Sequence, residues 1–235
     1  MNIDIRVFDN VDSTNSVLSE MVQKGADDGR VVVAWSQNSG RGRLGRTFES
    51  PKGGIYMSIL LPLEDPMRLT AKIGVAVKRA IFQETDKRTQ IKWVNDIIYN
   101  GKKVAGILAQ VCNNHVVVGI GINFCTEMKD FSPELKDIAT SLYRFSAEAD
   151  SEPMDLVNGV IREIENVLEE EDRLWLGEYR ASSCLIGKQV DIIVNGKING
   201  SGTVTEIDND CALHIMDNGL ETVLNAGEVS VREKH

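Results

Sequence analysis

Apolar and polar residues follow two different periods along the first 85 positions, which predicts a mixture of strands and helices. Short β-branched runs predict strands over residues 3–8, 29–35 and 55–61. A first amphipathic helix is expected to start behind Asp12-Ser13, with one of these two side chains as its N-cap, and to end at Gly25. Apolar residues spaced by three and four predict a second helix over residues 69–81.

Three strand-like runs then follow one another, over residues 91–99, 103–112 and 116–124. The dipeptides Asn100-Gly101 and Asn113-Asn114 join them, and both are typical of tight hairpins because Asn and Gly tolerate a positive φ. This spacing predicts an antiparallel meander. A long helix over residues 156–168 and a shorter one over 174–179 come next.

The last fifty residues have a different pattern, in which short alternating runs are separated by turn residues. Strands are expected over residues 190–194, 202–207, 212–216, 222–224 and 229–231. Five strands in so short a stretch indicate a small barrel or sandwich. The chain is therefore predicted to have an α+β domain over residues 1–184 and a β module over residues 185–235.

The composition limits the function. The 235 residues are 42% apolar and carry a formal charge of −9, which predicts a globular chain that binds neither nucleic acid nor membranes broadly. No secretory signal or membrane-spanning run is recognised. The four cysteines lie far apart in the sequence, so reduced thiols in the cytoplasm are expected and no metal site is assigned.

The most distinctive segment is a loop rich in glycine and arginine over residues 37–46. Gly40, Gly42 and Gly45 fit the pattern G-x-G-x-x-G, but a strand and not a helix is predicted to follow, which argues against a dinucleotide site. Arginines interleaved with glycines suit an anion, because guanidinium forks and backbone N–H groups can both approach it. The alternative is an exposed basic loop.

Two further segments leave alternatives open. Lys92 lies in an apolar run, on the face opposite Ile91 and Trp93, and would need an anionic partner there unless it protects a sheet edge. Asp12 to Asn15 either cap a helix or contact a ligand, and Asn123 either reads an adenine edge or forms a turn.

Taken together, six segments resemble the biotin protein ligases in order and spacing over essentially the whole chain. These segments are residues 12–15, 37–46, 53–56, 92–96, 105–108 and 119–123. The resemblance implies a class II synthetase-like catalytic domain, with a mixed or antiparallel sheet flanked by helices, and a small C-terminal SH3-like β-barrel.

The resemblance also implies a reaction. Family members use ATP with Mg²⁺ to activate biotin as biotinyl-5′-adenylate, and then transfer biotin to one lysine of a carboxylase carrier domain. By position, Lys92 and Arg43 would be catalytic. Biotin would contact Ser13, Thr14, Asn15, Gln37, Gly40, Arg41, Gly42, Arg43, Lys92 and Gly106, within a slot walled by Trp35, Trp93 and Leu108. The nucleotide would contact Arg41, Arg43, Arg46, Lys92, Asn95 and Asn123.

Three departures from the family pattern refine this expectation. Val94 replaces a frequent proline, and Ile138 falls where some relatives place a tryptophan over adenine. Only twelve residues precede Ser13, too few for the DNA-binding segment of bifunctional relatives, so the monofunctional type is expected.

Relatives often form homodimers. A lipoate–protein ligase and a non-catalytic sensor of biotin or nucleotide remain the alternatives.

Overall fold

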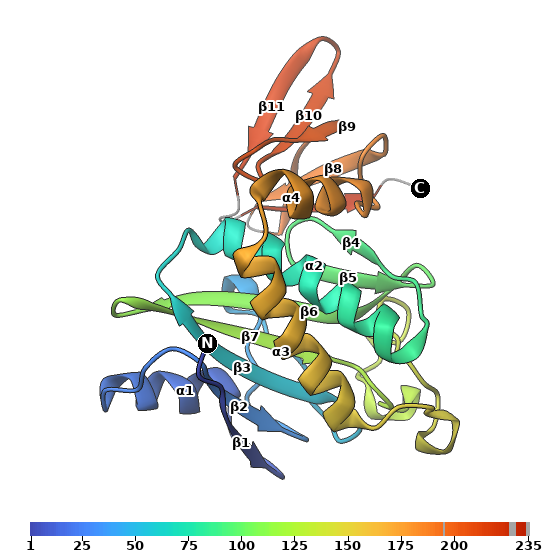
Figure 1. Cartoon of the computed structure of the whole chain (residues 1–235). Helices are drawn as coiled ribbons and strands as arrows, with labels where there is room; N and C mark the ends of the chain where they lie inside the picture. Colours follow the sequence, from blue (N-terminus) through green and yellow to red (C-terminus); the bar gives the residue numbers. More distant parts are fainter. Residues whose placement is uncertain (195, 226–228, 234–235) are drawn as a thin grey trace.

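The computed structural model describes residues 1–194, 196–225 and 229–233, with side chains as far as residue 225 (Figure 1). Its larger sheet has seven strands in the order β1-β2-β3-β7-β6-β5-β4. The strands are β1 (Asp4–Phe8), β2 (Arg30–Ala34), β3 (Ile55–Pro62), β4 (Gln90–Lys92), β5 (Asp96–Tyr99), β6 (Lys102–Cys112) and β7 (His115–Ile122). Only β1 and β2 pair in parallel, because helix α1 (Thr14–Gln23) carries the chain back between them. The predicted mixed sheet is confirmed.

The meander predicted from residue 91 differs in one place from the structure. Residues 91–99 form two strands, β4 and β5, which pair antiparallel with Lys92 opposite Asp96. The peptide bond between Trp93 and Val94 in their turn is cis. The side chains of Trp93 and Val94 are both buried, at 5% and 2% exposure. In one continuous strand, two successive side chains would point to opposite faces of the sheet, whereas here the strand is interrupted by a turn. The hairpin brings Lys92 and Asp96 side by side.

Helices cover the two faces of the sheet unequally. Helices α2 (Pro66–Thr85), α3 (Pro153–Glu169) and α4 (Asp172–Ala181) lie over one face, where most of the apolar core is buried (Figure 1). Helix α1 lies against the other face, on a small core that includes Leu18, Val32 and Val117. The rest of that second face is left for the site described below.

The C-terminal strands form a second, antiparallel sheet of five strands in the order β11-β10-β9-β8-β12. They are β8 (Gln189–Val194), β9 (Lys197–Ile207), β10 (Leu213–Asp217), β11 (Leu220–Leu224) and β12 (Val229–Glu233). Strand β9 starts five residues before the predicted position, because its first residues pair with the end of β8. This sheet shares the large apolar core with the α2 side, and a domain boundary at residue 184 stays a prediction.

Among the residues that the structure describes, no helix is long and apolar enough to cross a lipid bilayer.

Candidate active site

A cavity of about 940 Å³ opens on the second face of the large sheet, on the part of that face that α1 does not cover. Glycines make the floor of this cavity: Gly106 and Gly121 pair directly across β6 and β7, and Gly119 pairs with Leu108. Because they lack side chains, other groups approach the sheet closely. A Cβ added at Gly121 would lie 2.5 Å from the ring of Phe48, and one added at Gly106 would lie 3.0 Å from it.

The cavity brings together most of the residues that the sequence singled out. Segments far apart in the chain supply them: the start of α1, the glycine loop, the β4–β5 hairpin and β6. The lining includes Ser13, Thr14, Asn15, Gln37, Arg41, Gly42, Arg43, Arg46, Lys92, Trp93, Asn95, Gly106 and Leu108. Arg41, Arg43 and Lys92 therefore line one common cavity.

Three predicted residues lie outside the lining. Gly40 lies where the loop packs tightly against its own backbone, since an added Cβ would lie 2.3 Å from the Phe48 carbonyl oxygen. Trp35 packs against the apolar core instead of walling the slot. Asn123 is buried and donates from Nδ2 to the Thr140 carbonyl at 3.0 Å, so its amide holds the segment whose Ile138 lines the cavity.

The predicted cap of α1 is also corrected. Ser13 occupies the N-cap position, but its side chain makes no cap hydrogen bond. The first N–H of the helix, on Thr14, donates instead to Gln37 Oε1 at 2.9 Å. A side chain from the glycine loop thus satisfies the end of the helix, and the Ser13 side chain is left to line the cavity.

Another part of the cavity lining, here called the cationic wall, carries the side chains of Arg43, Lys92 and Lys103. Arg43 donates to Asn95 Oδ1 at 3.3 Å, and Asn95 Nδ2 donates to the Ile107 carbonyl at 3.0 Å, so the loop is attached to the hairpin and to β6. Burial lowers the pKa of the Arg43 guanidinium, and nearby Asp96 opposes that shift. A partly desolvated guanidinium interacts more strongly with an incoming anion than one in water does.

Two residues that matter here were missed from the sequence. Lys103 lines the cavity, with Nζ 2.6 Å from Asp96 Oδ1 and 5.5 Å from the centroid of the Phe48 ring. Like Lys92, it is a lysine in a mostly apolar strand, so the argument made for Lys92 should have found it. Phe48 covers the glycine pair, but nothing in the sequence distinguished its ring.

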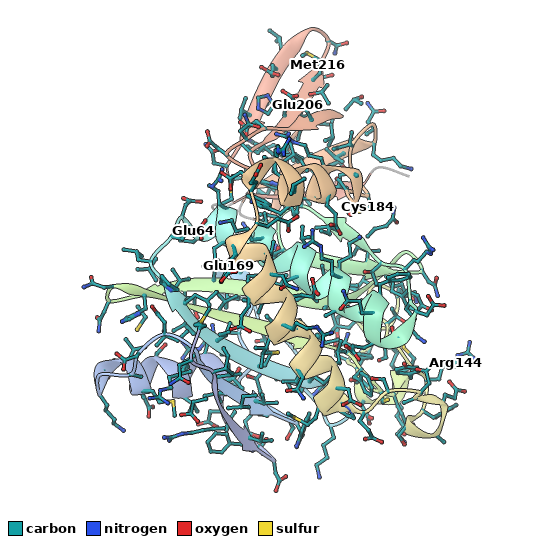
Figure 2. The ribbon with its side chains drawn as sticks, viewed as in Figure 1. Glu64, Arg144, Glu169, Cys184, Glu206 and Met216 are labelled. Atoms are coloured by element: carbon teal, nitrogen blue, oxygen red, sulfur yellow. The ribbon has the colours of Figure 1, made fainter. Side chains whose placement is uncertain are left out.

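The C-terminal part of the chain reaches the same cavity. Cys184, labelled in Figure 2, lies in the connection between α4 and β8, and it lines the cavity together with Leu185, Lys188 and Ile193. Trp93 Nε1 donates to the Cys211 carbonyl at 2.8 Å, which links the hairpin to the second sheet. Within the described part of the chain, no three His, Cys, Asp or Glu side chains gather as a metal cluster.

Comparison with known proteins agrees with this geometry. Residues 7–123 match the sequence profile of the biotin/lipoate A/B protein ligase family, and residues 185–232 match that of the biotin protein ligase C terminal domain. A structure of biotin protein ligase from Aquifex aeolicus in complex with biotin and ATP superimposes with a TM-score of 0.87 at 28% identity, covering 98% of this chain and 99% of that one.

Two curated relatives are similar in sequence to this chain, and both are named as ligases. The bifunctional ligase/repressor BirA of Bacillus spizizenii is 42% identical over 150 residues, which are 60% of this chain and 46% of that protein; the match thus spans less than half of the relative. The biotin--[acetyl-CoA-carboxylase] ligase of Mycobacterium tuberculosis is 30% identical over 92% of this chain and 85% of its own length. The chain belongs to the biotin protein ligase family.

Proposed function

We propose that the chain is an ATP-dependent biotin–protein ligase, as its family membership suggests. The observation that carries the proposal is that a polar, glycine-floored slot and a cluster of cationic side chains share one cavity. A neutral bicyclic ring with a carboxylate tail matches such a cavity at both ends.

In the first step, an oxygen of the biotin carboxylate attacks the α-phosphorus of ATP, the bond from that phosphorus to the bridging oxygen breaks, and diphosphate leaves. Two anions must approach each other, so positive charge fixed beforehand lowers the barrier. Arg41, Arg43 and Lys92 line the cavity and would take this role, and Lys103 adds a further cation.

In the second step, the ε-amine of an acceptor lysine attacks the acyl carbon of biotinyl-5′-adenylate. The C–O bond to AMP breaks, an amide forms, and the amine gives up a proton. Between the two steps the mixed anhydride must be kept from water. Phe48 and the arginine-bearing loop cover the floor of the slot and would exclude water there.

Mg²⁺ would accompany the nucleotide. This ion is commonly held by one or two carboxylates together with substrate phosphates, and does not need a cage of protein ligands. Asp96 offers a carboxylate at the cationic wall of the cavity, and its Oδ2 would be the oxygen for that role, since Oδ1 is paired with Lys103 Nζ at 2.6 Å. The ion would screen the negative charge of the phosphates.

The acceptor we propose is the biotin carboxyl carrier domain of a carboxylase. We also propose a cytoplasmic location, since the reaction consumes ATP and all four cysteines are free thiols. A homodimer stays a prediction that analytical ultracentrifugation can check.

The test is to incubate the protein with a purified carrier domain, biotin, ATP and Mg²⁺, and to measure the mass of the carrier. One biotinyl group per carrier, lost when the acceptor lysine is changed to arginine, is the expected result. Lipoate supplied in competition should not be transferred; preferential lipoylation would favour a lipoate–protein ligase. Binding of biotin with no modification of any carrier would favour a sensor.

A further inference from the structure

We propose that Ser58 is a positioning residue that fixes the Thr14 hydroxyl as a hydrogen-bond acceptor for an N–H group of a cyclic urea. The inference rests on the proposed function and concerns the same cavity. Ser58 lies on β3 with no exposed surface, and it does not line the cavity itself. It would act through the two residues that do line it, Thr14 and Asn15.

The contacts of Ser58 are short and lead in two directions. Its Oγ lies 2.7 Å from Thr14 Oγ1 and 2.6 Å from Asn15 Oδ1. Beyond these residues, Thr14 Oγ1 lies 3.1 Å from Gln37 Oε1, and Asn15 Nδ2 donates to Gln110 Oε1 at 2.8 Å. One chain of polar groups therefore runs from the glycine loop through α1 and β3 to β6.

Counting protons gives this chain a direction. The Ser58 hydroxyl has one proton, and Asn15 Oδ1 can only accept, so that proton belongs to the bond with Asn15. The Thr14 hydroxyl also has one proton, and two oxygens lie within its reach: Ser58 Oγ at 2.7 Å and Gln37 Oε1 at 3.1 Å. Gln37 Oε1 does not depend on it, because the backbone N–H of Thr14 already donates there at 2.9 Å.

The consequence concerns what Thr14 offers a ligand. With its proton held within this chain, by Ser58 Oγ or by Gln37 Oε1, the Thr14 hydroxyl presents a lone pair to the cavity and can accept from an N–H donor. Without Ser58, the hydroxyl would keep only the longer contact with Gln37 Oε1, which already accepts from the Thr14 N–H, and it could rotate and present its proton to the ligand instead. A cyclic urea carries N–H groups that need an acceptor, whereas a dithiolane ring carries none, so Ser58 would set specificity from outside the contact surface.

The local fold explains how this arrangement is possible. Ser58 pairs across the sheet with Gly119, and a Cβ on Gly119 would lie 2.2 Å from Asn15 Oδ1. The missing side chain lets the Asn15 amide reach Ser58. At the other end, Gln110 Oε1 accepts from Asn15 Nδ2 and so keeps Oδ1 facing Ser58.

The test is to change Ser58→Ala and to measure binding of three ligands by calorimetry: biotin, desthiobiotin, which keeps the urea but lacks the thioether ring, and ATP. Loss of a buried hydroxyl that leaves partners unsatisfied should weaken biotin and desthiobiotin by the same factor, ~10- to 100-fold. ATP affinity should stay unchanged. The matched control is Thr85→Val, which removes another buried hydroxyl, bonded to the Ile81 carbonyl on α2, and which should alter none of the three.

A second pair of variants keeps the proposal falsifiable if Ser58→Ala does not fold. Gln110 is only partly buried; Gln110→Leu removes the acceptor that orients Asn15, whereas Gln110→Glu keeps one. Weaker urea binding in the first and not in the second supports the proposal. Equal losses for biotin and ATP, or no loss at all, overturn it. A wild-type protein that binds no biotin would instead refute the proposed function.

Discussion

Asp96 and the two lysines beside it, Lys92 and Lys103, form one corner of the cationic wall. Lys92 is the cross-strand neighbour of Asp96, and Lys103 Nζ lies 2.6 Å from the Asp96 carboxylate. Two ammonium groups outweigh one carboxylate, so this corner keeps a net positive charge. An excess of that kind suits the joining of two anionic substrates.

Lys92→Ala should therefore slow adenylate formation by ~10²–10³, the scale of losing one preorganised charge. Single-turnover formation of biotinyl-adenylate from labelled ATP measures this step directly. Lys102→Ala is the matched control, because Lys102 donates to the Lys136 carbonyl and does not line the cavity. An unchanged rate in Lys92→Ala would remove Lys92 from the mechanism.

The glycine loop, residues 37–46, is held in place partly by a residue that lines the cavity. It folds back on itself, with Gly42 N–H donating to the Arg46 carbonyl at 2.7 Å and Phe48 N–H to the Gly40 carbonyl at 2.9 Å. Its attachment to the hairpin runs through Arg43 and Asn95. Arg43 therefore brings a positive charge to the cavity and also holds the loop to the β4–β5 hairpin through its hydrogen bond to Asn95.

Arg43→Gly should loosen the cover over the intermediate, so that biotinyl-adenylate escapes about tenfold faster, as expected when one charge-assisted contact is lost. Escaped adenylate acylates lysines at random. The measurement is biotin incorporation into a bystander protein mixed with the carrier, compared with the wild-type enzyme. Labelling that stays confined to the carrier lysine would contradict the role of Arg43 in retention.

How far the sequence predicts these elements depends on whether their causes are local. The period of apolar residues located α2 and α3, and Asn-Gly located the turn between β5 and β6, because a few neighbouring residues determine such features. The cap of α1 was wrong because its partner, Gln37, is 23 positions from Thr14. Ser58 gave no signal for the same reason: its partners come from a different element.

At the scale of the whole molecule, arginine side chains attach the second sheet to the part of the chain that forms the large sheet. Arg180 on α4 donates to the Ile207 carbonyl at 2.6 Å and to Asn209 Oδ1 at 2.9 Å. Arg68 on α2 donates to the Asn209 carbonyl at 2.6 Å. Because Trp93 and Lys188 line the cavity from either side of this junction, its integrity should affect both stability and catalysis.

Arg180→Ala should lower the free energy of unfolding by about 1–3 kcal/mol, since charged hydrogen bonds are lost and a carbonyl is left without its donor. For a chain of this size, the melting temperature should fall by about 2–4 °C for each kcal/mol. Thermal unfolding measures the change, and hydrogen exchange should show faster opening in β9 and β10. Arg162→Ala is the control: its ion pair with Glu84 is solvent-exposed and should contribute less than about 1 kcal/mol. Equal losses in both variants, or opening that spares the second sheet, would mean that Arg180 does not hold the two parts together.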